Sequence, residues 1–230
     1  MTETEKVTPQ RIKSFVRRKG RITPGQNFAL ENHWELYCLN PQADINFSEV
    51  FGNNSPLIVE IGFGNGDSLA RMAQANPHKY YIGIEVHRPG VGHLLMLIEQ
   101  MQLSNIRIYC HDAIEILEQR VSDASLAGVH LFFPDPWHKK KHHKRRIVRD
   151  SFVELISNKL MLNGYFHAAT DWENYAEWIL AILNNEPKFQ NLSSTQTYCE
   201  RPDYRPLTKF EQRGIRLGHG VWDLIFKKSM

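Results

Sequence analysis

Short runs of apolar residues recur along the chain from about residue 56, and each is followed by a stretch with helical spacing. The runs are rich in Val, Ile, Leu, Phe and Tyr and predict strands at 57–62, 80–86, 106–110, 129–133 and 165–170. The stretches between and after them predict helices at 67–76, 90–103, 113–121, 148–161 and 172–184. Continuously apolar strands that alternate with helices predict an α/β fold, with a mainly parallel sheet covered by helices on both faces.

The two ends of the chain depart from this alternation. Residues 1–25 are rich in Lys and Arg and end in a Pro-Gly break, so we expect a flexible basic arm there. The remainder, 26–230, is expected to be a single domain, since 230 residues suffice for one sizeable core. Two further β-like stretches, at 192–199 and 221–227, flank a loop rich in Pro and Gly.

Composition excludes several classes of protein. The chain is 42% hydrophobic and 23% charged, which is ordinary for a globular domain. It has no apolar stretch near the roughly 20 residues of a membrane helix and no apolar core of a signal peptide, so we expect a cytoplasmic protein without a membrane partner. Its three scattered cysteines fit neither a disulfide framework nor a zinc pattern, and we expect no metal.

The positive charge of the chain is concentrated in two segments. Six of the 28 Lys and Arg residues lie in 139–146, and seven more lie in 1–21. Acidic residues outnumber basic ones over the rest of the chain. A solvated basic run is a sufficient explanation for either segment alone, but two such runs on an acidic body favour a nucleic-acid partner.

The segment HLFFPDPWHKKKHHKRR, residues 130–146, places candidate chemistry beside one of these runs. A predicted strand delivers Asp135 and Trp137 to a rigid turn that contains Pro134 and Pro136, and the eight residues 139–146 beyond it are all Lys, Arg or His. This combination favours a site that handles one planar group of a polyanion. Trp137 fits either stacking on a nucleobase or packing in the core, and the sequence leaves both open.

A glycine-rich loop, EIGFGNG at 60–66, follows the first predicted strand, where parallel sheets bind ligands. Its G-x-G-x-G spacing and the acids Glu60 and Asp67 disfavour a pyrophosphate at the helix N-terminus. Glu85 ends the second strand and can accept both hydroxyls of a ribose, and Asp112 ends the third and can accept from an adenine amine. The outline fits S-adenosylmethionine, although a capping aspartate, a solvated glutamate and turn glycines would each explain one part of it.

Several motifs together resemble the bacterial tRNA (guanine-N7)-methyltransferase family, from about residue 11 to the end of the chain. They are EIGFGNG (60–66), GIEV (83–86), HDA (111–113), FPDPWHKKKHHKRR (133–146), TDW (170–172), TKFE (208–211) and the basic arm RIKSFVRRKGRIT (11–23). The resemblance implies a Rossmann-like class I methyltransferase fold with a seven-stranded, mainly parallel sheet. It also implies methyl transfer from S-adenosylmethionine to N7 of a guanine in the variable loop of tRNA, at tRNA position 46.

The resemblance further implies roles for individual residues. Asp135 would be the catalytic residue, and cofactor contacts would come from Asp135, Glu60, Gly62, Gly64, Gly66, Glu85 and Asp112. Contacts to the substrate or to RNA would come from Lys139, Lys141, His142, His143, Lys144, Arg145, Arg146, Asp171, Thr208, Lys209, Phe210 and Glu211. The histidine pair departs from the mostly Lys, Arg or small polar residues expected there. The sequence leaves the oligomeric state open between monomer and homodimer.

The chemistry of guanine limits what such a site must do. N7 carries an in-plane lone pair and no proton, so its methylation needs in-line positioning and a favourable field and not a general base. Asp135, Asp171 and Glu211 are the candidates for stabilising the positive charge of the product and for accepting from guanine N1–H and N2–H. We assign Asp135 to orientation and electrostatics.

Three alternatives compete with this prediction. Methyltransferases that act on exocyclic amines commonly carry two adjacent prolines at this strand end, whereas Asp135 separates the prolines here. A nicotinamide-dependent oxidoreductase is disfavoured by the glycine spacing and by Glu60. A non-catalytic tRNA-binding module is disfavoured by the intact acids at all three cofactor strand ends, and tRNA binding without methyl transfer would support it. The first alternative stands for any RNA- or base-directed methyltransferase of other specificity.

Overall fold

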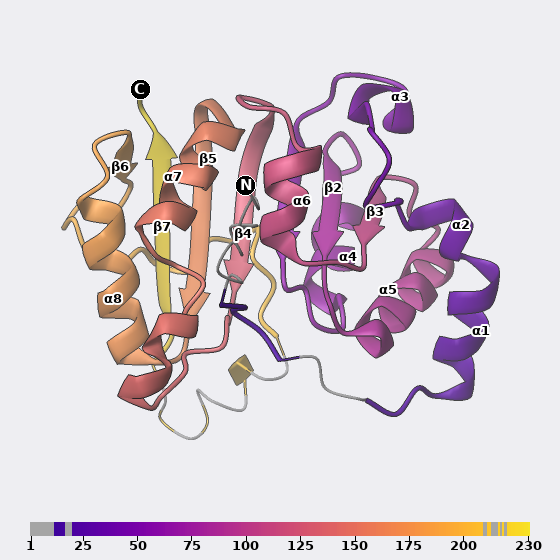
Figure 1. Cartoon of the computed structure of the whole chain (residues 1–230), viewed down its shortest axis with the longest axis horizontal. Coiled ribbons are helices and arrows are strands. Elements are labelled where there is room, and N and C mark those ends of the chain that lie inside the picture. The colour runs from indigo at the N-terminus through magenta and orange to yellow at the C-terminus, as the bar shows by residue number, and fades with distance from the viewer. Residues whose placement is uncertain (1–11, 17–19, 209–210, 213–215, 217, 219) are drawn as a thin grey trace, which may run out of the picture.

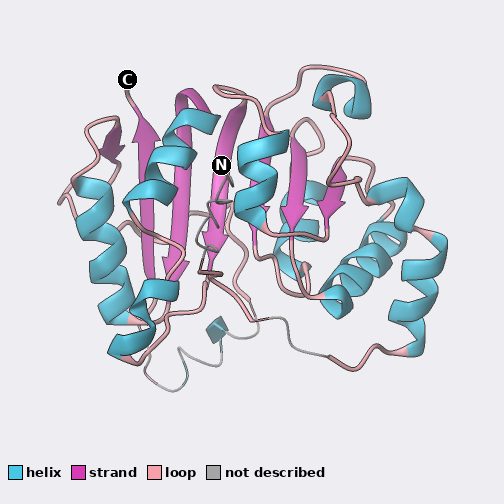
Figure 2. Cartoon of the chain, viewed as in Figure 1, coloured by secondary structure: helices cyan, strands magenta, loops and turns pink. Residues whose placement is uncertain are grey.

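The centre of the molecule is a seven-stranded sheet with the strand order β3-β2-β1-β4-β5-β7-β6 (Figure 1). The computed structural model describes residues 12–16, 20–208, 211–212, 216, 218 and 220–230. The strands are β1 Leu57–Ile61, β2 Tyr80–Ile84, β3 Ile106–Tyr109, β4 Leu126–Phe132, β5 Leu160–Thr170, β6 Phe189–Asn191 and β7 Trp222–Lys228. The first five pair in parallel, whereas β7 runs antiparallel to both β5 and β6, as its arrowhead shows in Figure 2. The predicted α/β fold with a mainly parallel sheet is confirmed.

One predicted strand is wrong. The stretch 192–199 was expected to be extended, but the strand is β6, at Phe189–Asn191, and the following residues form turns. The side chain of Asn191 accepts from the backbone N–H of Ser193 at 2.8 Å and donates to the carbonyl of Thr197 at 3.1 Å. Short polar side chains that bond to the nearby backbone in this way compete with a strand ladder.

Helices cover both faces of the sheet. The predicted ones appear as α4 Asp67–Ala75, α5 Arg88–Met101, α6 Ala113–Arg120, α7 Asp150–Lys159 and α8 Glu173–Asn184. The helix predicted at 148–161 is shorter because β5 begins at Leu160 and includes Asn163 and Gly164, which resembled a helix stop. Three helices that were not predicted, α1 Pro24–Asn32, α2 Trp34–Tyr37 and α3 Phe47–Phe51, precede the sheet. Thr23 and Gln26 form a capping box at the start of α1.

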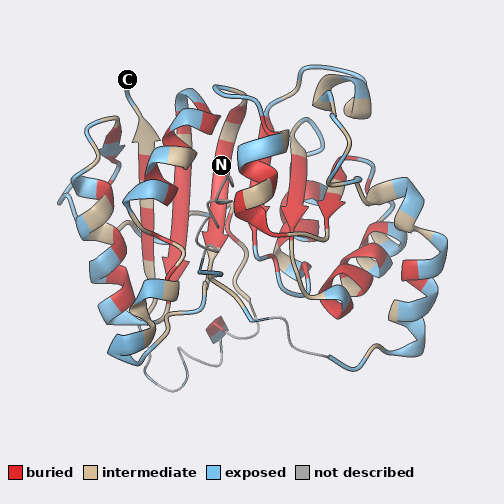
Figure 3. Ribbon diagram, viewed as in Figure 1, coloured by how far each residue is buried: buried red, intermediate tan, exposed pale blue. Residues whose placement is uncertain are grey.

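The apolar core lies in two layers, one on each face of the sheet. Side chains of α6, α7 and α8 pack on one face, and those of α1, α4 and α5 pack on the other. All five residues of β1 are buried, and the central strands form the most buried part of the molecule in Figure 3. Each fully buried aliphatic side chain contributes about 1.5–3 kcal/mol relative to an exposed one, so this layering fixes the strand ends firmly.

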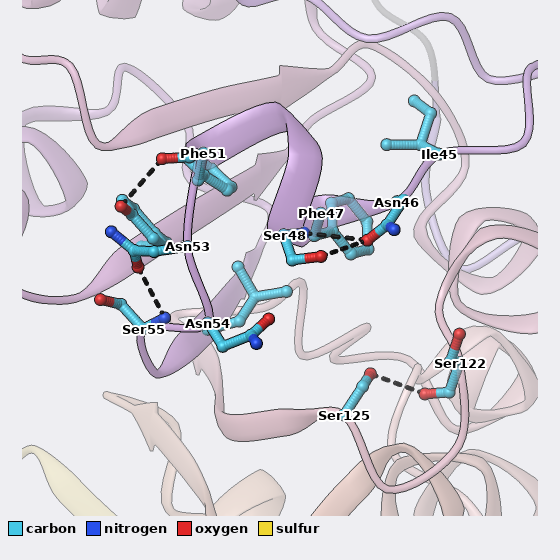
Figure 4. A pocket seen from close by; sticks show the side chains of 12 residues that line it. Ile45, Asn46, Phe47, Ser48, Phe51, Asn53, Asn54, Ser55, Ser122 and Ser125 are labelled. Atoms are coloured by element: carbon cyan, nitrogen blue, oxygen red, sulfur yellow. Dashed lines mark hydrogen bonds between the residues drawn. The ribbon is translucent and has the colours of Figure 1, made fainter.

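A hollow at the amino ends of β1 and β2 carries little candidate chemistry. Its lining, shown in Figure 4, is made of Asn, Ser and apolar side chains. The hydroxyl of Tyr80, the one titratable group in this lining, donates to the carbonyl of Phe51 at 3.0 Å. Because ligands of parallel α/β sheets bind at the carboxyl ends of the strands, we place the functional site at the opposite end.

Candidate active site

Two hollows meet at the carboxyl ends of the parallel strands. The smaller, of about 250 Å³, is lined by Glu85, Asp112 and Asp135, among others. The larger, of about 620 Å³, is lined by Glu60, the glycine loop and the segment from Pro206 to Thr208. Both are also lined by Gly62, Phe132 and Phe133. The topology therefore brings the predicted glycine loop and acids to one edge of the sheet.

The three glycines of the loop have different structural roles. Gly62, Gly64 and Gly66 all have positive φ, at 72°, 60° and 81°, a conformation that favours glycine. A Cβ atom on Gly62 or Gly64 would meet nothing within 4 Å, so their backbone is open to a ligand. A Cβ on Gly66 would lie 2.8 Å from Leu94, so this glycine permits α4 and α5 to pack closely. The loop is thus both a tight turn and an open ligand-binding surface.

Glu60 is a buried carboxyl group with an unsatisfied oxygen. The residue is 2% exposed, and its Oε2 has no hydrogen-bond partner among the described residues. Burial, and secondarily the charge of Glu85, raise the pKa of Glu60 to about 8. The group is therefore mainly protonated at neutral pH, and a cationic ligand beside it would favour the ionised form.

Backbone hydrogen bonds fix two of the three acids in the lining of the smaller hollow. The Glu85 carboxylate accepts from the N–H groups of Gly64 at 2.9 Å, Val86 at 2.7 Å and His87 at 2.9 Å. Asp112 is buried and accepts from the N–H of Ile114 at 3.0 Å, so it does cap α6. A carboxylate has about four acceptor sites, so one capping hydrogen bond is compatible with a ligand contact.

The turn after β4 holds Asp135 in an exposed position between two strained residues. Phe133 and Trp137 have positive φ, at 51° and 49°, which costs on the order of 1–3 kcal/mol each for non-glycine residues. The N–H of Phe133 donates to the carbonyl of Ala169 at 2.7 Å, which ties this turn to the end of β5. Asp171 follows that strand end, so Asp135 and Asp171 leave adjacent strands at the same edge.

Trp137 has several partners within the protein. Its indole N–H donates to the carbonyl of Ser14 at 3.1 Å, and the guanidinium of Arg145 lies 5.0 Å from its ring centroid. The ring of His142 approaches edge-on at 6.0 Å. Ser14 also lines the smaller hollow, so Trp137 holds an N-terminal segment beside it. These contacts favour an anchoring role over stacking on a nucleobase.

The basic run forms a 3₁₀ helix, η1, at Lys140–Arg145. The four lysines at 139, 140, 141 and 144 are exposed, whereas His142, His143 and Arg145 are half-buried. Partial burial and neighbouring cations lower the pKa of His142 below its ordinary value. The exposed lysines form the surface that we expected for RNA contacts.

The structure places Arg146 differently from that expectation. The residue is 1% exposed, and its guanidinium donates to the carbonyl of Pro136 at 3.0 Å and to the side chain of Asn174 at 2.8 Å. It also lies over the rings of Tyr175 and Trp178, at 4.8 and 5.2 Å. Because its guanidinium is buried among these groups, Arg146 supports the turn after Asp135 and does not belong to the exposed basic surface.

The segment near the C-terminus contributes Thr208 to the larger hollow. Glu211 is 3% exposed, and both of its carboxylate oxygens accept from Arg205, at 2.7 and 2.8 Å. This geometry therefore disfavours a direct contact between Glu211 and guanine. Lys209 and Phe210 lie outside the described residues. Sequence reasoning missed Arg205, although its position three residues before Thr208 was a usable signal.

Within the ranges that the structure describes, no group of three or more His, Cys, Asp or Glu side chains could hold a metal ion. No helix in the described part of the chain is long and apolar enough to cross a membrane.

Comparisons with known proteins show the family of the chain and its fold. The family model described as "Putative methyltransferase" matches residues 54–224. The tRNA (guanine-N(7)-)-methyltransferase of Shewanella amazonensis is 57% identical over 221 residues, covering 95% of this chain and 92% of that protein. The protein of the same name from Alcanivorax borkumensis is 55% identical, covering 98% and 95%. The crystal structure of the 16S rRNA methyltransferase KamB matches with a TM-score of 0.59 over 82% of this chain and 96% of that one, and at 13% identity it shows the fold alone.

Proposed function

The chain belongs to the tRNA (guanine-N(7)-)-methyltransferase family, and on that premise we propose that it methylates N7 of a guanine in tRNA with S-adenosylmethionine. The finer assignment, to the variable loop at tRNA position 46, is part of the same proposal. The observation that carries it is the 57% identity to a named relative along 95% of the chain.

The residues at the strand ends fit the cofactor. Gly62 and Gly64 leave open backbone, and Glu60 offers an unsatisfied buried carboxyl group to a cationic ligand. Glu85 and Asp112 would hold the ribose and the adenine in the smaller hollow. When bound, the cofactor supplies an electrophilic methyl group on a sulfonium.

The protein has little proton chemistry to perform in this reaction, because guanine N7 reacts through a free lone pair. Asp135 is exposed in the lining of the smaller hollow, where its carboxylate can orient the base and favour the positive charge that N7 acquires. Asp171 leaves the neighbouring strand and is the second candidate for hydrogen bonds to guanine N1–H and N2–H. Positioning of this kind accounts for a large share of the rate of a two-substrate reaction.

The exposed lysines of η1 and its flank would bind the tRNA backbone. Phosphate contacts supply affinity that falls with salt, whereas base contacts select the nucleotide. Asp135 lies four residues before Lys139, so the backbone contacts and the base contacts come from one continuous segment. This arrangement supports RNA, and not a small molecule, as the acceptor.

The test is transfer of labelled methyl from S-adenosylmethionine to unmodified tRNA, followed by nucleoside analysis and mapping of the product. We expect 7-methylguanosine confined to the variable loop. Label in another nucleoside would overturn the assignment to N7, and tight tRNA binding without transfer would show a non-catalytic binding module. A tRNA with adenosine in place of the target guanosine is the matched substrate control and should accept no label.

A further inference from the structure

We propose that Arg205 is a positioning residue of the methyl-transfer site, which fixes Thr208 and Glu211 against the end of β4. The inference rests on the proposed function, since it assigns a role within the same site. No motif that carried the family resemblance includes Arg205, and its role follows from its contacts.

The guanidinium of Arg205 binds two carboxylates from different parts of the chain. Nε and Nη2 donate to the two oxygens of Asp223 at 2.7 and 2.8 Å, and Nη1 and Nη2 donate to those of Glu211 at 2.8 and 2.7 Å. Arg205 is 1% exposed, and both acids are also buried. Two bidentate pairs fix the guanidinium plane in a way that a single ammonium group cannot.

The same guanidinium contacts the residues that lead to Asp135. It lies 5.8 Å from the ring centroid of Phe132 and 5.6 Å from that of Phe133. Phe133 is one of the two strained residues beside the turn of Asp135, and it lines both hollows. Arg205 therefore supports this strained backbone from within the protein.

On its other side, Arg205 fixes a wall of the larger hollow. The N–H of Glu211 donates to the hydroxyl of Thr208 at 3.1 Å, and the N–H of Thr208 lies 3.4 Å from Glu211 Oε2. Thr208, with Pro206 and Leu207, lines the larger hollow together with Glu60 and the glycine loop. Any shift of the Arg205–Glu211 pair would move this wall relative to the glycine loop.

Asp223 anchors the network to the sheet. It lies on β7 and also accepts from Nε2 of His167, on β5, at 2.7 Å. The hydroxyl of Tyr204 hydrogen-bonds to Nδ1 of the same histidine at 2.8 Å. Burial lowers the pKa of His167, so the ring is neutral, donates through Nε2 to Asp223 and accepts at Nδ1 from Tyr204. Tyr204 and Arg205 are thus fixed side by side before the segment enters the hollow.

The variants Arg205→Lys and Arg205→Met test the proposal, with Arg120→Met as the control. Lys retains the positive charge but lacks the planar guanidinium that binds two carboxylates. Met retains much of the side-chain length without the charge. Arg120 pairs with a single exposed carboxylate, Asp44, at 2.8 Å, away from the lining of either hollow. The readouts are KM and kcat for both substrates, calorimetric binding of S-adenosylhomocysteine, and circular dichroism.

We expect kcat/KM for S-adenosylmethionine to fall by about 10- to 100-fold in Arg205→Lys, the scale of loss from a misplacement near 1 Å. Affinity for S-adenosylhomocysteine should also fall, while tRNA binding and the far-ultraviolet spectrum stay as in the wild type. Arg205→Met should lose more, and if it fails to fold, Arg205→Lys decides.

A folded Arg205→Lys with wild-type kinetics and wild-type S-adenosylhomocysteine affinity would overturn the inference, even if its melting temperature fell. An inactive wild-type protein would instead overturn the proposed function. The two failures are therefore distinguishable in one experiment.

Discussion

Two buried carboxyl groups at the same end of the sheet have opposite surroundings. Glu60 has an oxygen with no partner among the described residues, whereas each oxygen of Glu211 accepts a hydrogen bond from Arg205. Their exposures, 2% and 3%, are nearly equal, so burial does not account for the difference. A buried polar group left unpaired costs free energy, and a binding site is where a ligand can supply the missing partner. The contrast separates a carboxyl group that we propose is paired by a ligand from one that the protein itself pairs.

Asp223, the second carboxylate bound by Arg205, differs from Glu60 in its protonation state as well. Burial raises the pKa of Glu60, so its neutral form is favoured at neutral pH. For Asp223 burial has the same tendency, but hydrogen bonds from His167 and Arg205 outweigh it and lower the pKa. The protein thus keeps one acid ionised by pairing it and leaves another near its titration point beside the glycine loop.

The largest expected effect comes from breaking the paired region. Glu211→Ala leaves the guanidinium of Arg205 with one carboxylate, and removing one member of a buried pair costs about 3–5 kcal/mol of the free energy of unfolding. Urea denaturation measures this loss, and Glu115→Ala, which removes a partly exposed hydrogen bond to His111, is the control. An unchanged urea midpoint for Glu211→Ala would contradict the description of this region as a structural clamp.

The opposite change in stability is expected at Glu60. A carboxyl group with a raised folded pKa stabilises the protein fully below its unfolded pKa of 4.5, and that stability is lost as pH rises toward about 8. Glu60→Gln should therefore stabilise the free protein at pH 8 by roughly 1–3 kcal/mol and by little near pH 4. The same variant should bind S-adenosylmethionine more weakly. Thermal melts across this pH range test the prediction, and parallel pH profiles for the two proteins would refute it.

The basic surface gives a third comparison, between exposed and buried cations of one run. Replacing the exposed Lys139, Lys140, Lys141 and Lys144 with Gln should lower the slope of log affinity for tRNA against log salt by about 3–4 units, since each is expected to contact a phosphate. Arg146→Gln should leave that slope unchanged and reduce stability, because its guanidinium is buried. Filter binding at several salt concentrations measures both slopes. If Arg146→Gln lowered the slope as much as the replacement of each exposed lysine does, the distinction between exposed and buried cations would be wrong.

The smallest effect is expected from His142. Its lowered pKa keeps the ring neutral at pH 7, so its charge contributes to tRNA binding only as pH falls further. RNA phosphates favour the protonated ring, so tRNA binding should tighten slightly between pH 7 and pH 5.5. His142→Gln should abolish that increment, whereas substitution of the exposed His78 should not. An identical pH profile for wild type and His142→Gln would contradict this role.

The sequence predicted the features that depend on local pattern and topology. Apolar runs identified six strands of the sheet, including β7 at the predicted stretch 221–227. The rule that parallel strands share one carboxyl edge brought Glu85, Asp112 and Asp135 together. The sequence could not predict which residue of the charged run is buried. Arg145 and Arg146 are adjacent and of the same type, and they differ in the aromatic rings that surround them in the folded protein. The Arg205 network joins residues that are 18 and 56 positions apart, a pairing that no local spacing reveals.

The central claim is that Asp135 serves methyl transfer and not RNA affinity, and Asp135→Ala tests it most directly. Single-turnover transfer from labelled S-adenosylmethionine to tRNA should fall by at least about 100-fold, the scale of losing one preorganised electrostatic contact. Binding of the same tRNA, measured in parallel, should remain within about twofold, since phosphate contacts supply most of the affinity. Near-wild-type transfer by Asp135→Ala would contradict the account.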